Sequence, residues 1–86
     1  MGKVAVSFRI MPEGVEVDLD RLQAIVRKSL GGRLKKLEVT PVAFGLNAIE
    51  VIAVLDDASG EMEKVESSLA GLPGVGGVET TEVTLL

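Results

Sequence analysis

Two segments in the middle of the chain decide the fold: Pro41-Val42-Ala43-Phe44-Gly45-Leu46 and Ile49-Glu50-Val51-Ile52-Ala53-Val54-Leu55. The second is almost uninterrupted in apolar residues and rich in β-branched side chains, which is typical of a strand buried on both faces in the centre of a sheet. In the first, Phe44 is one of only two aromatic residues and directly precedes Gly45, whose backbone freedom favours a turn. We therefore expect a central strand, entered from a turn that presents a large apolar side chain suited to contact a partner.

Three further segments predict strands. Residues 3–11 alternate between apolar and mostly polar or small side chains, as in a strand with one face on the core. Residues 33–44 contain lysines and Pro41, which cannot donate to a ladder, and residues 78–85 contain the polar run Glu79-Thr80-Thr81-Glu82. These features place both segments at the edges of the sheet.

Two helices complete the expected order strand-helix-strand-strand-helix-strand. The first is expected between Asp18, a favourable N-cap, and Gly31-Gly32, and the second between Ser59, another N-cap, and Gly71. Met62 belongs to the apolar stripe expected on the second helix. This order predicts an α+β fold, the ferredoxin-like plait, with a four-stranded antiparallel sheet in the order 4-1-3-2 and both helices on one face.

The predicted topology has a consequence for function. The second strand runs opposite to the fourth, so the turn with Gly45 and the C-terminal Leu86 are expected at opposite ends of the sheet. A chain of 86 residues is expected to form a single domain, residues 1–86, with an aliphatic core.

The composition excludes several kinds of chemistry. The chain has no Cys and no His, so disulfides, thiolate nucleophiles, imidazole bases and the usual zinc ligands are absent. The one adjacent acidic pair, Asp56-Asp57, is expected to be a solvated loop rather than a metal or acid/base site. We therefore expect neither an enzyme nor a cofactor or metal site.

The charge is distributed unevenly. Residues 1–36 carry eight basic and four acidic side chains, whereas residues 37–86 carry one basic and nine acidic side chains, for a net charge of −4. An acidic balance argues against general nucleic-acid binding but suits steering toward a basic protein. The basic cluster in residues 27–36 is expected to be a helix C-terminus and a solvated edge strand, with RNA contact as the alternative. Neither a signal peptide nor a membrane span is visible, and the missing Cys fits a cytosolic protein, so we expect a cytoplasmic location. On its own, the protein is expected to be a monomer.

The quoted segments also carry a family resemblance. Residues 41–46, followed by an alternating apolar strand that ends Val54-Leu55-Asp56-Asp57, resemble the signature segment of translation elongation factor 1-beta. The opening strand from Val4 to Pro12, and the ending Val75-Gly76-Gly77-Val78-Glu79, are similar too. The resemblance covers essentially the whole chain, whose length matches the short archaeal form of the family, the guanine-nucleotide exchange domain alone.

The resemblance implies a function and a partner. It implies a guanine-nucleotide exchange factor, not an enzyme of covalent chemistry, that promotes GDP release and hence GDP/GTP exchange on the GTPase elongation factor 1-alpha during protein synthesis. In the family, the aromatic turn packs against one domain of the GTPase, and the far end of the sheet disturbs the nucleotide and magnesium site in another. The implied partner-binding residues are Pro41, Val42, Ala43, Phe44, Gly45, Leu46, Thr84, Leu85 and Leu86.

The sequence departs from the family in one respect. Eukaryotic relatives insert a lysine next to their last residue toward the magnesium site, whereas this chain has Leu85 there. We therefore expect the end of the last strand, with the terminal carboxylate, to act sterically.

Other interpretations stay open at this point. On the pattern alone, Phe44 is as well explained as a core aromatic at a strand end. A small-molecule-sensing regulatory domain of the same fold is the alternative function. An acylphosphatase-like enzyme would need a phosphate-binding loop ending in Arg after the first strand, and residues 11–16 are acidic and lack it.

Overall fold

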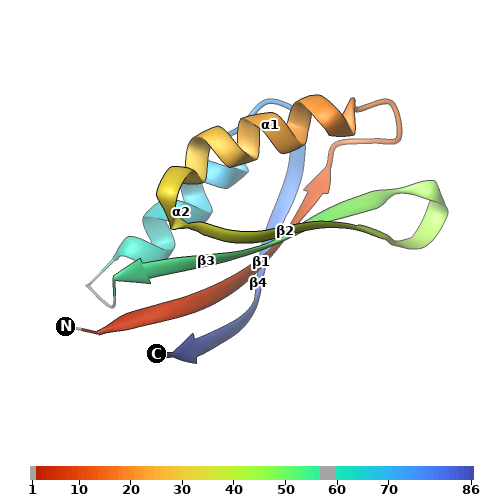
Figure 1. Cartoon of the computed structure of the whole chain (residues 1–86). Coiled ribbons are helices and arrows are strands. Elements are labelled where there is room, and N and C mark those ends of the chain that lie inside the picture. Colours follow the sequence, from red (N-terminus) through yellow and green to blue (C-terminus); the bar gives the residue numbers. More distant parts are fainter. Residues whose placement is uncertain (1, 57–59) are drawn as a thin grey trace.

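In residues 2–56 and 60–86, which the computed structural model describes, four strands form one antiparallel sheet and two helices pack on the same side of it (Figure 1). Short 3-10 turns at Gly31–Arg33 and Ala43–Gly45 lie between these elements. In chain order the elements are β1 (Lys3–Pro12), α1 (Leu19–Leu30), β2 (Leu34–Pro41), β3 (Asn47–Asp56), α2 (Glu61–Ala70) and β4 (Val75–Leu85).

The sheet has the order β2-β3-β1-β4, which is the predicted order 4-1-3-2 read from the other edge. β1 pairs antiparallel with both β3 and β4, so that Val6 lies between Ala53 and Val83. The two segments with lysines, proline or a polar run are the edge strands β2 and β4. The ferredoxin-like fold predicted from the sequence is confirmed.

The core lies between the sheet and the two helices. Alternation in β1 places Val4, Val6, Phe8 and Ile10 on the helix-covered face, and each is at most 6% exposed. The apolar positions of α1 and α2 meet the same cluster, so both helices cover one face of the sheet. The cluster consists of Val4, Val6, Phe8, Ile10, Leu22, Val26, Leu30, Ile49, Val51, Ala53, Leu55, Val65, Leu69 and Val75.

The start of α1 confirms the predicted N-cap. The Asp18 carboxylate accepts the backbone N–H groups of Asp20 at 3.1 Å and of Arg21 at 3.3 Å, two donors that would otherwise lack a partner in the first turn. The helix ends at Gly31, as expected. The expected cap Ser59 and the acidic residue Asp57 lie outside the described residues.

Three details of the sequence prediction are wrong. β3 is not buried on both faces along its length: Ala48 is buried, but Ile52 and Val54 on the same face are half-buried, because both helices cover the other face. β2 ends at Pro41 rather than continuing to residue 44, because the chain turns there. β4 begins at Val75, three residues earlier than expected, and Gly76 lies so close to β1 that a Cβ would be 2.9 Å from the Pro12 carbonyl oxygen.

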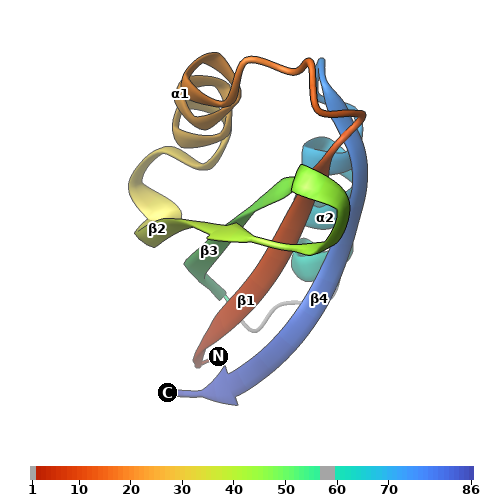
Figure 2. The same ribbon diagram turned by 90° about the vertical axis from the view of Figure 1, so that its right-hand side faces the viewer.

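The β2–β3 turn and the C-terminus lie at opposite ends of the sheet (Figure 1). At one end Pro41 pairs with Asn47, and at the other Lys3 pairs with Asp56 and Val4 with Leu85. Along β3, at about 3.3 Å per residue, the two ends are about 30 Å apart. Figure 2 looks onto the turn, with the C-terminus at the bottom of the view. The structure measures 41 × 20 × 17 Å along its principal axes, so the predicted contacts occupy separate parts of an elongated molecule.

Candidate functional site

The turn between β2 and β3 is held by two backbone hydrogen bonds. Val42 N–H donates to the Leu46 carbonyl at 2.8 Å, and Leu46 N–H donates to the Ala43 carbonyl at 3.3 Å. Between them, Phe44 has a φ of 62° and Gly45 a φ of 75°. Glycine adopts this left-handed conformation readily, whereas for another L-residue it costs about 1–2 kcal/mol.

Phe44 therefore occupies a strained position without contributing to the core. Its side chain is 94% exposed, which rules out the core-aromatic alternative. Of the other predicted turn residues, Pro41, Ala43 and Gly45 are exposed, while Val42 and Leu46 are half-buried. Strained backbone and a fully exposed aromatic ring are both unfavourable for an isolated domain, and such features are concentrated at functional sites.

The C-terminal end of the sheet presents a second exposed apolar surface. Leu85 pairs with Val4, and Leu86 N–H donates to the Lys3 carbonyl at 3.0 Å, so the backbone is anchored to β1 up to the last residue. The side chains nevertheless point to solvent: Leu85 is 75% and Leu86 70% exposed, and Thr84 is exposed as well. The three predicted C-terminal residues lie together, apart from the turn.

Two further exposed apolar residues were not predicted as site residues. Val83 is 48% exposed, and Met62, expected in the apolar stripe of α2, is 37% exposed. Thr80 Oγ1 donates to Glu66 Oε2 at 2.6 Å, which fixes α2 against β4. α2 begins at the end of the sheet where the C-terminus lies (Figure 1), and Met62 is the second residue of this helix. The sequence signal that could have indicated Val83 is its alternation with Leu85 in an otherwise polar edge strand.

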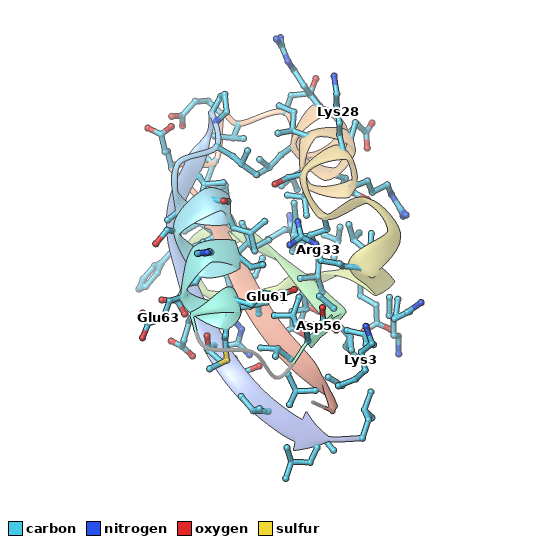
Figure 3. The ribbon with its side chains drawn as sticks, turned by 90° about the vertical axis from the view of Figure 1, so that its left-hand side faces the viewer. Lys3, Lys28, Arg33, Asp56, Glu61 and Glu63 are labelled. Atoms are coloured by element: carbon cyan, nitrogen blue, oxygen red, sulfur yellow. The ribbon has the colours of Figure 1, made fainter. Side chains whose placement is uncertain are left out.

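An ion pair joins β1 to β3 beside these residues. Lys3 Nζ lies 2.6 Å from Asp56 Oδ1, and both side chains are exposed (Figure 3). The hydrogen bond and charge of Asp56 raise the pKa of Lys3, and those of Lys3 lower the pKa of Asp56. Asp56 is thus a solvated residue, as expected, but it is the last residue of a strand and not part of a loop.

The basic cluster in residues 27–36 forms the end of α1 and the exposed start of the edge strand β2, as expected. Arg33 donates to the carbonyls of Ser29 and Leu30, each at 3.3 Å, and so caps the end of α1. Lys36 Nζ lies 3.2 Å from Glu38 Oε1. The last turn of α1 is basic and the first turn of α2 is acidic, as Lys28, Glu61 and Glu63 illustrate in Figure 3.

The helix-free face of the sheet contains a shallow hollow of about 280 Å³, lined mainly by polar and charged side chains. Among residues 2–56 and 60–86, no three acidic side chains gather to hold a metal ion. No helix in the same part of the chain is both long and apolar enough to cross a membrane. The two exposed apolar ends are therefore the strongest candidate contact surfaces.

The sequence similarity of this chain to known proteins shows its family. The family model for the EF-1 guanine nucleotide exchange domain matches residues 5–86. The chain belongs to the EF-1 guanine nucleotide exchange domain family. Both candidate surfaces of this family member lie within the matched residues, and the resemblance seen in the sequence is confirmed.

Similar proteins of archaea carry the name elongation factor 1-beta. That of Methanococcoides burtonii is 42% identical over 87 residues, which cover 96% of each chain. That of Methanothermobacter thermautotrophicus is 40% identical over 88 residues, covering 100% of this chain and 99% of the relative. Among solved structures, the ACT domain from the GTP pyrophosphokinase of Chlorobium tepidum has a TM-score of 0.64, covers 92% of this chain and 99% of its own, and is 12% identical. At that identity the likeness shows the fold alone.

Proposed function

We propose that this chain promotes GDP release, and hence GDP/GTP exchange, on elongation factor 1-alpha during protein synthesis in the cytoplasm. The observation that carries the proposal is the exposed, strained Phe44 at one end of a sheet whose other end exposes Leu85 and Leu86, in a member of an exchange-domain family. The chain would supply binding energy and steric displacement and would break no covalent bond.

The turn is proposed as the docking contact. An aromatic ring can bury a large apolar area and commonly carries a large share of interface energy. The backbone of the turn already holds Phe44 away from the protein, so the backbone itself would lose little conformational freedom when a partner pocket encloses the ring. Pro41 and Ala43, exposed on the same segment, would line the rim of that contact.

The C-terminal end is proposed as the displacing contact. Thr84, Leu85 and Leu86 extend along β1 to the limit of the sheet, where their backbone is fixed by pairing and their side chains are exposed. Docked through the turn, the sheet would hold this end about 30 Å away, the length of β3 at 3.3 Å per residue. That distance suits contact with two separate parts of a GTPase.

Linkage explains how binding becomes exchange. A factor that binds the nucleotide-free GTPase more tightly than the GDP-bound form must lower the affinity for GDP by the same ratio. Each tenfold difference corresponds to about 1.4 kcal/mol of binding energy used in this way. Contacts worth a few kcal/mol more in the nucleotide-free form are therefore sufficient for a large loss of GDP affinity.

Release of a fluorescent GDP analogue from archaeal elongation factor 1-alpha tests the proposal. The GTPase is loaded, mixed with excess unlabelled nucleotide, and followed with and without this protein. Acceleration at substoichiometric amounts is the expected result, since one exchange factor serves many GTPase molecules. An unchanged release rate, with a folded protein and a competent GTPase, would contradict the proposed function.

A further inference from the structure

A row of charged residues crosses the helix-free face of the sheet. Glu50 in β3 lies opposite Glu38 in β2 and opposite Arg9 in β1, and Arg9 in turn lies opposite Glu79 in β4. Like charges directly opposite each other on a sheet are unfavourable, so the Glu38–Glu50 pair is a cost to the fold. An apolar residue at position 50 would match the half-buried Ile52 two residues further along the same face.

The Glu50 carboxylate connects three strands. Its Oε2 accepts from Arg9 Nε at 3.0 Å and lies 3.0 Å from Arg9 Nη2. Its Oε1 accepts from Thr40 Oγ1 at 3.3 Å. The side chain is 34% exposed and that of Arg9 41%, so these charge-assisted bonds are partly shielded from water. Through Glu50, the end of β2 is tied to the central strand β1.

This tie lies at the base of the turn. Thr40 directly precedes Pro41, which has no N–H and cannot donate to the ladder where the hairpin leaves the sheet. Beyond Pro41, Ala43, Phe44 and Gly45 are exposed and do not pack on the core. The direction in which the hairpin projects is thus set mainly by its base.

We propose that Glu50 is a positioning residue for the Phe44 contact: through Thr40 and Arg9 it holds the β2–β3 turn rigidly against the centre of the sheet. This role rests on the proposed function of the turn. It explains why a charged residue stands in the middle of the apolar strand β3, where an apolar residue would serve stability at least as well. Arg9 is 41% exposed and lies opposite Glu79, so loss of Glu50 would not leave it as a buried unpaired charge, which is the main cost of breaking a buried ion pair.

The Glu50→Leu variant separates positioning from stability. It removes both bonds and the repulsion with Glu38 and leaves the 41% exposed Arg9 in contact with water, so the midpoint of urea unfolding is expected to change little. In the free protein, hydrogen exchange of the Val42 amide, which bonds to Leu46, is expected to become about fivefold faster, the scale of one net hydrogen bond. The dissociation constant for nucleotide-free elongation factor 1-alpha should rise by a similar factor.

Three further variants make the test specific. Glu50→Gln keeps one acceptor oxygen for Arg9, and its NH2 group can donate to Thr40 Oγ1, so it should restore most of the affinity. Thr40→Val removes only the bond to the turn's base and should reproduce the loss. Glu38→Leu is the matched control: Glu38 lies in the same row and, in residues 2–56 and 60–86, is paired only with Lys36, so this variant should bind normally. Combined with Phe44→Ala, Glu50→Leu should add no further loss, because an absent ring cannot be misplaced.

The outcomes distinguish this role from the proposed function. If the unmodified protein fails to bind the GTPase, the proposed function is wrong and the positioning role with it. If the unmodified protein binds but Glu50→Leu binds equally well, or leaves Val42 exchange unchanged, only the positioning role is overturned. An affinity loss that simply follows a loss of unfolding stability would also overturn it.

Discussion

Phe44→Ala is the most informative single substitution, because it separates folding from binding. The ring is 94% exposed and outside the core cluster, so its removal should change the free energy of unfolding by less than about 0.5 kcal/mol. Alanine has the same difficulty with a left-handed backbone, so the strain at this position is not relieved. The variant should therefore unfold at the same urea concentration as the unmodified protein.

The effect on binding can be estimated from the buried area. An aromatic ring that passes from full exposure into a pocket buries about 150–250 Å², equivalent to about 4–6 kcal/mol at 25 cal/mol per Å². Incomplete burial and the contacts that alanine retains reduce this value toward the scale of an interface hot spot, about 2 kcal/mol. We therefore expect the dissociation constant for elongation factor 1-alpha to rise about 30-fold.

Isothermal titration calorimetry with the nucleotide-free GTPase measures this change, and a titration of GDP release gives its kinetic counterpart. The concentration for half-maximal acceleration should rise, whereas the maximal rate should hardly change because the C-terminal end is intact. Phe44→Gly should lose as much affinity but gain about 0.5–1 kcal/mol in unfolding stability, since glycine relieves the left-handed strain. Unchanged affinity in a folded Phe44→Ala variant would refute the docking role of the turn.

Three other predictions concern the remaining parts of the sheet. Deletion of Thr84–Leu86 should lower the maximal rate of GDP release while the domain stays folded by circular dichroism; full activity would show that this end displaces nothing. Gly76→Val should lower unfolding stability by about 1–3 kcal/mol, because its Cβ would meet the backbone of β1; an unchanged urea midpoint would contradict the close approach. Lys3→Met tests the ion pair with Asp56. The pKa of Asp56 is lowered in the folded protein, so its contribution to folding stability is present above its ordinary pKa of about 4 and is lost as the pH falls through its pKa in the folded state. The pKa of Lys3 is raised, so its contribution is present below its ordinary pKa of about 10 and is lost as the pH rises through its pKa in the folded state. The melting temperatures of the two proteins should thus differ slightly between about pH 4 and 10 and converge at lower and at higher pH, and a difference independent of pH would contradict the pairing.

Much of the fold could be predicted because its local signals agree with one another. The alternation of β1, the Asp18 cap and the edge features of β2 and β4 all indicated the arrangement that the structure has. The double burial expected for β3 was wrong because an apolar run does not reveal whether anything covers its second face. Ile52 and Val54 look like core residues in sequence, yet both helices lie on the other side.

The candidate site could also be predicted only in part. The position of Phe44 before a glycine indicated a turn but left a core aromatic as an equal alternative, and the C-terminal contact residues were implied by the family resemblance. The left-handed backbone of Phe44 could not be predicted, because it results from the closure of the turn between Val42 and Leu46. Glu50 escaped notice because its partner Arg9 is 41 residues away in sequence, and only the strand register brings the two together.

The central claim is that this sheet binds one state of a GTPase in preference to another, and its most direct test is a comparison of two affinities. The dissociation constant of this protein is measured for nucleotide-free and for GDP-bound archaeal elongation factor 1-alpha, together with the GDP affinity of the GTPase with and without saturating protein. We predict at least tenfold tighter binding to the nucleotide-free form, about 1.4 kcal/mol or more, and a loss of GDP affinity by the same factor. Equal affinities for the two forms would contradict the account.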